Sequence, residues 1–282
     1  MTTITRILIL ILIGVVSSIN AQDFQGIATY RTHRDFDIKM DSTKMNDAMQ
    51  KQMMDMMKKQ FQKTYTLTFD KSSSLYKQEA ELDKPQVGGG LQMSFGNSGS
   101  DVFYKNIQNK TYADQKETMG KKFLIKDSIS PIEWKLESDT KHIGEYMCFK
   151  ATYTKQVPKV NMNFSSFSSI DDENEEEKEP EMTERTITAW YTPQISVSNG
   201  PAKYQGLPGL ILEIHDGKLT VICSKIVINP KDKIEIEEPT KGKEVTQKEY
   251  DDIMDKKTKE MMERYAPSRG SKDGAIHISI GG

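Results

Sequence analysis

The amino-acid sequence predicts a mainly β protein (α+β), built as a large antiparallel twisted sheet or an open barrel that is covered by two amphipathic helices. Three observations favour this fold class. Short segments of alternating apolar and polar residues recur along the chain, with turn residues between them. Two other segments show the helical spacing of apolar residues. The length of the chain suits one large domain or two small ones.

The N-terminus has the pattern of an export signal. Arg6 supplies the positive charge, residues 7–16 are almost wholly apolar, and Ala21 is a small residue suited to the cleavage position. We therefore expect a signal peptide at 1–21 and a single β-rich domain at 22–282. No cysteine follows the apolar run, so a lipid-anchor site is not expected, and no later segment is apolar enough to span a membrane. The expected location is the periplasm or the extracellular space.

Ten segments are expected to be strands of the main sheet, because they alternate apolar and polar residues or are rich in β-branched and aromatic ones. They lie at 26–31, 65–69, 74–79, 101–106, 121–127, 133–137, 147–154, 185–191, 210–215 and 218–228. The last two are expected to form a tight hairpin through 215–218, since Asp-Gly tolerates the positive φ angles of a type I′ turn. A further short strand is expected at 275–280.

Two segments are expected to be helices. At 44–63, six methionines and Phe61 fall on one half of a helical wheel, opposite lysines and aspartates. The second helix is expected from Gln247 to Arg264, where Thr246 and Glu249 form a capping box. Both helices are expected to cover the open side of the sheet.

Two stretches are expected to lack regular structure. Residues 88–100 are rich in Gly and Ser, and residues 164–181 are rich in Ser and then strongly acidic. The net charge of the whole chain is −2, and no concentrated basic patch is present. Nucleic acid is therefore not an expected partner.

The methionine-rich segment has three interpretations. It can pack as a core or lid element, it can form a groove for an apolar ligand or partner, or its thioethers can bind Cu(I). Core or lid packing is the most frequent role of such a stripe, and the segment holds no Cys or His that would strengthen a copper site. The residues expected to line an apolar site are Met49, Met53, Met56, Met57 and Phe61, with Trp190 and Leu210 behind them.

The titratable residues do not form a recognisable catalytic or metal motif. The sequence lacks a nucleophile-elbow or zincin pattern, and its four histidines have no ligand spacing. His215 and Asp216 are adjacent and therefore expected on opposite faces of a strand. We expect no enzyme activity, no cofactor and no metal. Cys148 and Cys223 can either form a disulfide, which export permits, or remain as free buried thiols.

The string Gly206–Ile211 (GLPGLI) is expected to be a turn that leads into a strand. Pro208 and Gly209 suit the second and third positions of a type II turn, and the apolar residues that follow are β-prone. Together with residues 146–154 and 189–214, this string resembles the GLPGLI (Porph_ging) family of exported bacterial proteins. The residues that carry the resemblance are Cys148, Lys150, Ala151, Trp190, Tyr191, Gly200, Pro201, Gly206, Leu207, Pro208, Gly209, Leu210 and Ile211.

The resemblance implies an unassigned biochemical role and a fold similar to periplasmic lipoprotein carriers. Two departures are present, because Ser196 stands where the family has a proline and the acidic stretch lengthens the connection before Trp190. The expected role is non-enzymatic binding or carrying of an apolar small molecule, a lipid or an apolar partner segment. An accessory subunit that docks on an envelope protein, through the GLPGLI turn and residues 200–204, is the alternative.

Overall fold

Twelve strands form one large sheet in the computed structural model, which describes residues 24–35, 38–39, 51, 62–79, 101–158, 181–265 and 279–280. The strands are β1 (Gln25–Arg34), β3 (Thr64–Asp70), β4 (Ser73–Gln78), β5 (Val102–Asn106), β6 (Thr111–Thr118), β7 (Lys121–Ser128), β8 (Lys135–Ile143), β9 (Tyr146–Pro158), β10 (Met182–Thr192), β11 (Leu210–Asp216), β12 (Leu219–Ile228) and β13 (Lys243–Val245). Mainly β architecture is thereby confirmed.

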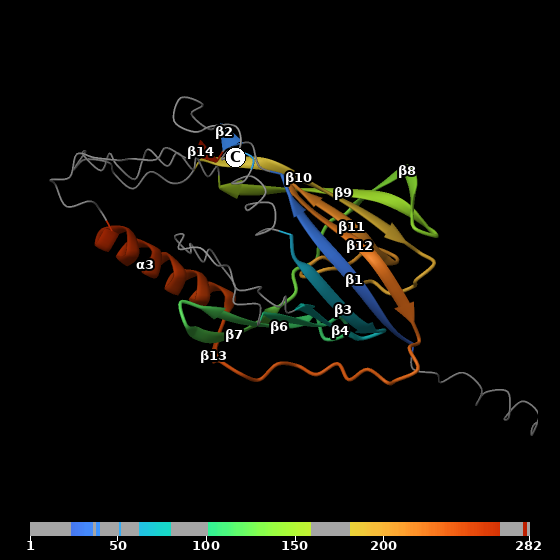
Figure 1. Cartoon of the computed structure of the whole chain (residues 1–282), viewed down its shortest axis with the longest axis horizontal. Helices are drawn as coiled ribbons and strands as arrows, with labels where there is room; N and C mark the ends of the chain where they lie inside the picture. The colour runs from blue at the N-terminus through green and yellow to red at the C-terminus, as the bar shows by residue number, and fades with distance from the viewer. Residues whose placement is uncertain are drawn as a thin grey trace, which may run out of the picture.

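The strand order is β13-β7-β6-β5-β4-β3-β1-β12-β11-β10-β9-β8. Neighbours pair antiparallel except β13, which lies parallel to β7, so the expectation of a purely antiparallel sheet is wrong at this edge. The coil between β12 and β13 explains the exception, since it runs along the outside of the sheet before β13 begins (Figure 1). The sheet is not closed, because β13 and β8 are the two ends of the order.

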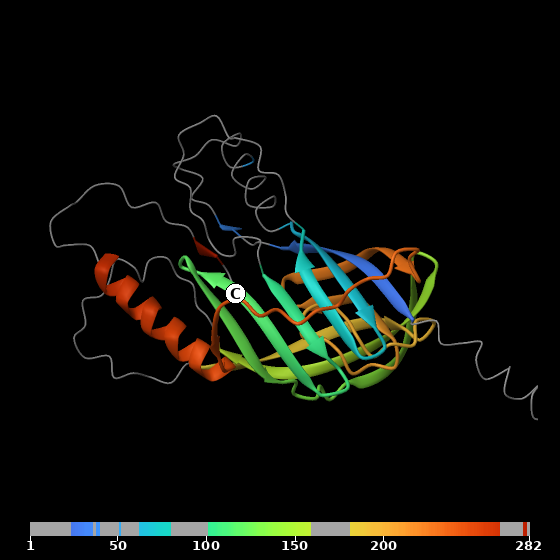
Figure 2. The same cartoon turned by 90° about the horizontal axis from the view of Figure 1, so that it is seen from below.

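The sheet curls around one main hydrophobic core. Tyr30 on β1 donates a hydrogen bond from its hydroxyl to the carbonyl of Ile211 on β11, at 2.7 Å. The Tyr30 ring also meets Tyr76 on β4 edge-on, with centroids 6.2 Å apart. Strands two positions away on either side of β1 thus meet on one side of the sheet, which we call the concave face (Figure 2). The barrel-like curvature was expected from the many short strands.

All ten expected strand segments overlap strands of the sheet, but two of its twelve strands, β6 and the short edge strand β13, were missed. The longer of the two, β6, reads TYADQKET, which has too few apolar residues to show alternation. It is a strand because β5 and β7 pair with it on both sides. The expected strand at 133–137 instead begins at Lys135 and continues to Ile143.

The hairpin between β11 and β12 is present, but its turn type was predicted wrongly. Asp216 pairs with Leu219, so Gly217 and Lys218 are the two loop residues. Positive φ occurs at Gly217 (61°) and not at Lys218. This fits a type II′ turn, whose first central residue alone needs positive φ, rather than type I′.

The C-terminal helix α3 (Gln247–Tyr265) is confirmed, together with its capping box. The Thr246 amide donates to Glu249 Oε2 at 2.7 Å, and the Glu249 amide donates to Thr246 Oγ1 at 3.2 Å. The helix packs against β7 through Tyr250, whose ring meets Phe123 edge-on at 5.4 Å. It lies at one end of the curled sheet in both views (Figures 1 and 2).

Several expected features fall outside the described residues. They are the signal peptide at 1–21, the loop at 88–100, the acidic stretch at 164–180 and most of the methionine-rich segment, of which the structure describes Lys51, as helical, and Gln62 and Lys63, outside any helix. Two helices are therefore not confirmed. In the C-terminal segment, β14 (Ser279–Ile280) pairs with β2 (Ile38–Lys39). Among the helices placed by the structure, none is long and apolar enough to cross a membrane.

Candidate functional site

The segment 193–209 folds back onto the core instead of leaving the sheet. Its backbone pairs with the start of β11: the Leu210 amide donates to Ile195 O at 3.0 Å and the Ile211 amide to Asn199 O at 2.9 Å. Ile195, Val197 and Leu207 are buried and belong to the main core. This segment, called the inner loop here, therefore forms part of the interior of the curled sheet.

The GLPGLI string closes the inner loop with a turn that is tighter than expected. The Gly209 amide donates to Leu207 O at 2.8 Å, a three-residue γ-type bond around Pro208. The type II turn predicted here is therefore wrong, whereas the expected strand after it begins at Leu210. Gly209 has φ of 157°, and a Cβ atom on it would lie 2.2 Å from Thr192 O. Glycine is needed because β10 and β11 approach so closely there.

Lys105 holds the inner loop from the opposite half of the sheet. Its side chain lies on β5 with no exposed surface. Its Nζ donates to Gly200 O at 2.7 Å and to Tyr204 O at 3.1 Å. Burial lowers the pKa of this amine to about 7, because a charged ammonium is costly in the core. Sequence reasoning missed Lys105, since a lysine in a short strand usually faces solvent.

Aromatic side chains form a row along the concave face, from β1 towards α3. Tyr65 and Tyr76 stack with centroids 4.7 Å apart, and Phe103 and Tyr112 stack at 5.3 Å. Tyr76 on β4 lies opposite Phe103 on β5, so the two stacked pairs are adjacent. Tyr65, Phe103, Tyr112 and Tyr250 are only half-buried. We call Tyr30, Tyr65, Tyr76, Phe103, Tyr112, Phe123 and Tyr250 the aromatic row.

A second group of polar side chains surrounds Asp216 where the inner loop reaches β11. The Tyr204 hydroxyl donates to Asp216 Oδ2 at 2.8 Å, and Lys155 Nζ donates to the same atom at 2.9 Å. Arg185 lies 3.6 Å from Asp216 Oδ1. Burial raises the pKa of Asp216, but the hydrogen bonds from Lys155 and Tyr204 outweigh it, so the pKa is lowered. The carboxylate is thus held in its charged form.

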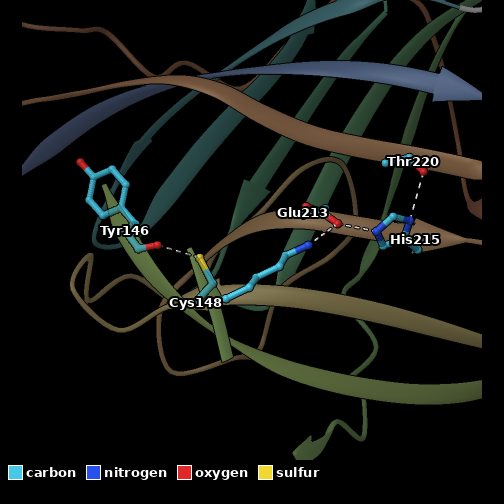
Figure 3. A network of polar contacts seen from close by, with 6 residues as sticks. Tyr146, Cys148, Glu213, His215 and Thr220 are labelled. Atoms are coloured by element: carbon cyan, nitrogen blue, oxygen red, sulfur yellow. Dashed lines mark hydrogen bonds and ion pairs between the residues drawn. The ribbon is translucent and has the colours of Figure 1, made fainter. Parts of the chain in front are cut away.

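Glu213 is the centre of a separate network that contains His215 but not Asp216 (Figure 3). Its side chain is 6% exposed, and Lys141 Nζ donates to Oε1 at 2.7 Å. His215 Nε2 contacts the same oxygen, and His215 Nδ1 lies 3.1 Å from Thr220 Oγ1. Lys141 also lies 4.4 Å from the centroid of the Trp190 ring. His215 and Asp216 thus have different partners, as expected for successive strand residues.

Both cysteines are free and buried in this structure. The pKa of Cys148 is raised to about 11 and that of Cys223 to about 12, in each case first by burial. Cys148 Sγ lies 3.6 Å from Tyr146 O (Figure 3). Thiols with raised pKa values are poor nucleophiles and poor ligands at neutral pH. Of the two alternatives for Cys148 and Cys223, a disulfide or free buried thiols, the structure shows the free thiols.

The structure describes only two of the residues expected to line an apolar site, Trp190 and Leu210. Met49, Met53, Met56, Met57 and Phe61 lie outside the described residues. Trp190 is half-buried beneath Lys141, and Leu210 is fully buried in the main core. The signal for the aromatic row was present in the sequence as Tyr and Phe in neighbouring strands, but their alignment depends on register.

The other motif residues serve mainly to build the sheet and the inner loop. Ala151 is fully buried, and Lys150 Nζ pairs with Glu137 at 2.8 Å. Ser196, which replaces the family proline, donates to Pro193 O at 3.1 Å and is exposed. Within the part of the chain that the structure describes, no three His, Cys, Asp or Glu side chains are grouped as a metal site.

Comparison with protein families identifies part of the chain. Residues 134–213 match the family described as "Protein of unknown function (Porph_ging)". The expected family resemblance is confirmed over this segment. The Porph_ging segment runs from Trp134 through β8, β9, β10 and the inner loop into β11, and it ends at Glu213. It therefore contains the inner loop and the centre of the Glu213 network.

Comparison with solved structures gives only weak likenesses. Two structures of PNGF-II, in space groups C2 and P21, are each 16% identical, with TM-scores of 0.47 and 0.46. The matches cover 83% and 82% of this chain, which spans 33% of the PNGF-II chain in both. LprF from Mycobacterium bovis is 9% identical, with a TM-score of 0.21, over 78% of this chain and 91% of LprF. No curated protein matches the chain significantly.

Proposed function

We propose that the protein binds or carries an apolar ligand, or an apolar partner segment, on the concave face of its curled sheet, in the cell envelope and without catalysis. The observation that supports this proposal is the aromatic row with its four half-buried rings. Partly exposed, stacked aromatic rings give a large apolar contact area at a small cost in side-chain entropy. The export signal expected at residues 1–21 supports the location.

The arrangement of the row favours a bound molecule over simple core packing. Tyr76 and Phe123 are 7% and 6% exposed and serve as the base of the row. Phe103 and Tyr112, stacked at 5.3 Å, keep part of their surface in contact with solvent. Lys105 and Tyr204 fix the inner loop opposite, so the interior does not need to rearrange before binding. Such a preformed apolar surface lowers the cost of ligand ordering.

Replacing Phe103 with alanine is expected to weaken binding of a neutral fluorescent apolar probe, such as N-phenyl-1-naphthylamine, at least about fivefold. The physical reason is the loss of roughly 1–2 kcal/mol of apolar contact from one side of the row. The measurement is a fluorescence titration of the mature protein. Tyr146→Ala is the matched control, since Tyr146 is also half-buried but lies outside the row. Equal affinities for wild-type protein and Phe103→Ala contradict the proposal.

The contribution of the methionine-rich segment is tested separately. Replacing Met53, Met56 and Met57 together with leucine keeps the segment apolar but removes its thioethers. Weaker binding of the apolar probe by a variant whose fold is unchanged indicates that the segment forms part of the site. Loss of Cu(I) binding with unchanged probe binding supports copper binding instead. Native mass spectrometry of protein from its own periplasm then shows whether an apolar molecule co-purifies.

Docking on an envelope protein is the second candidate, and exposed apolar side chains at one edge favour it. β8 ends the strand order, and Leu136 on β8 and Met147 on β9 are 56% and 45% exposed. The docking surface expected from residues 200–204 is less suitable, because Gly200, Pro201 and Tyr204 are buried. Pull-down with Leu136→Asp and Met147→Asp distinguishes this candidate, since neither change touches the aromatic row.

A further inference from the structure

Lys203 carries an exposed cationic side chain on the inner loop. It precedes Tyr204 on the inner loop, whose hydroxyl binds Asp216. The pKa of Lys203 is lowered, first by burial and then by the charges of Lys155 and Lys116, whereas Asp216 opposes the fall. Lys155 is on β9 and Lys116 is on β6, strands near opposite ends of the strand order. Charged side chains from two distant parts of the sheet therefore act on the Lys203 ammonium.

Positive charge is in surplus around Lys203. Lys116 pairs with Asp114 at 2.8 Å, and Asp101 also raises the pKa of Lys116. Lys155 and Arg185 share Asp216, at 2.9 Å and 3.6 Å. Among the described residues, Lys203 makes no hydrogen bond or ion pair. Its side chain is nevertheless exposed, and the Arg185 side chain is 44% exposed. A positive group is thus available to a bound molecule.

The cationic group adjoins the end of the aromatic row. Lys116 Nζ lies 5.8 Å from the centroid of the Tyr250 ring, and Tyr250 meets Phe123 at 5.4 Å. Tyr112, four residues before Lys116 on the same face of β6, stacks on Phe103 further along the row. The apolar surface on β4 to β7 therefore ends beside the cationic side chain of Lys116, which Asp114 pairs.

We propose that the ligand is an amphiphile with one anionic head group, a carboxylate or a phosphate. Its head binds at Lys203 and Arg185, and its apolar chain lies along the aromatic row. Asp216 does not oppose this binding strongly, because Lys155, Arg185 and Tyr204 already compensate its charge. Charge-assisted hydrogen bonds from lysine and arginine suit either head group. This inference rests on the proposed function and adds the chemical class of the ligand.

The test is displacement of the bound neutral probe by amphiphiles that share a dodecyl chain. Dodecanoate and dodecyl phosphate carry the two anionic head groups, and dodecyltrimethylammonium carries the opposite charge. For the wild-type protein, we expect the anions to displace the probe at concentrations at least fivefold lower than the cation. Lys203→Met is expected to remove most of that difference, and Lys203→Glu to reverse it. If only one of the two anions displaces the probe at lower concentration than the cation, its head group is the one that the site selects.

Lys77→Met is the control, because Lys77 is exposed and follows Tyr76 on β4, so it lies on the opposite face of the sheet. It is expected to leave all displacement curves unchanged. The inference is overturned if wild-type protein and both Lys203 variants prefer anions and cation equally while the probe still binds. Failure of the neutral probe to bind the wild-type protein overturns the proposed function itself, and the inference with it. Circular dichroism confirms that the variants are folded.

Discussion

Replacing Gly209 with alanine is expected to lower the free energy of unfolding by at least about 3 kcal/mol, or to prevent folding. The added Cβ would lie 2.2 Å from Thr192 O and 2.8 Å from the Pro193 nitrogen, and both are backbone atoms. Neither can move without separating β10 from β11, which carry Tyr191 and Ile211 in the main core. The measurement is urea unfolding followed by circular dichroism.

Gly120→Ala separates the clash at Gly209 from the general cost of removing a glycine. Gly120 has φ of 71°, and a Cβ atom on it would meet nothing within 4 Å. Its replacement therefore reports backbone strain alone, expected at about 1 kcal/mol. If Gly209→Ala costs no more than Gly120→Ala, the close approach of β10 and β11 is not what requires glycine in the GLPGLI turn.

Replacing Lys105 with methionine is expected to make protein stability depend less steeply on pH above neutrality. The folded-state pKa of Lys105 is about 7, whereas the ordinary pKa of a lysine is 10.5, so the unfolded chain binds the extra proton between these two values. Stability of the wild-type protein therefore rises with pH in this window, and the contribution disappears in the variant. The expected slope is roughly 1.4 kcal/mol per pH unit at most.

The sign and size of the difference are checked by urea unfolding at pH 6, 7.5 and 9. Near pH 6 both states are protonated, and methionine avoids the buried charge. Near pH 9 the neutral amine still donates to Gly200 O and Tyr204 O, whose loss costs about 1–3 kcal/mol per unpaired carbonyl. The free energy of unfolding of the wild-type protein should therefore increase relative to that of Lys105→Met as pH rises. A constant difference across this range would refute the role of burial at Lys105.

A variant of an exposed lysine, Lys77→Met, provides the reference for the pH series of Lys105→Met. Lys77→Met changes a solvated side chain on the neighbouring strand β4. Its difference from the wild-type protein should stay flat with pH, because this change removes no buried group. Comparison of the two variants removes the contribution of all other titrating groups.

Local patterns in the sequence predicted those elements whose stability depends on nearby residues. The capping box of Thr246 and Glu249 correctly marked the start of α3, since its hydrogen bonds join residues three apart. Apolar alternation correctly placed β1, β3 and β11. The turn types at Pro208 and Gly217 were predicted wrongly, because strand pairing decides which residues form the turn.

The candidate site was less predictable than the fold, because its residues come from distant strands. Lys105 and Gly200 are 95 positions apart, and no local pattern indicates that a lysine will be buried against a loop. Tyr204 binds Asp216 only because the inner loop folds back onto the concave face, and Lys155 binds it because β9 and β11 lie on either side of β10. Trp190 and Leu210 were expected to line an apolar site, but the structure places them under Lys141 and in the core.

The sequence by itself determined that this chain is mainly β, that it carries the Porph_ging pattern, and that a capped helix stands near its C-terminus. These properties follow from period-two alternation and from contacts a few residues apart. The tertiary structure decided that polar β6 is an interior strand of the sheet, that segment 193–209 turns inward, and that the aromatic row ends beside Lys116. Those depend on strand register and on the curl of the sheet, which long-range pairing fixes.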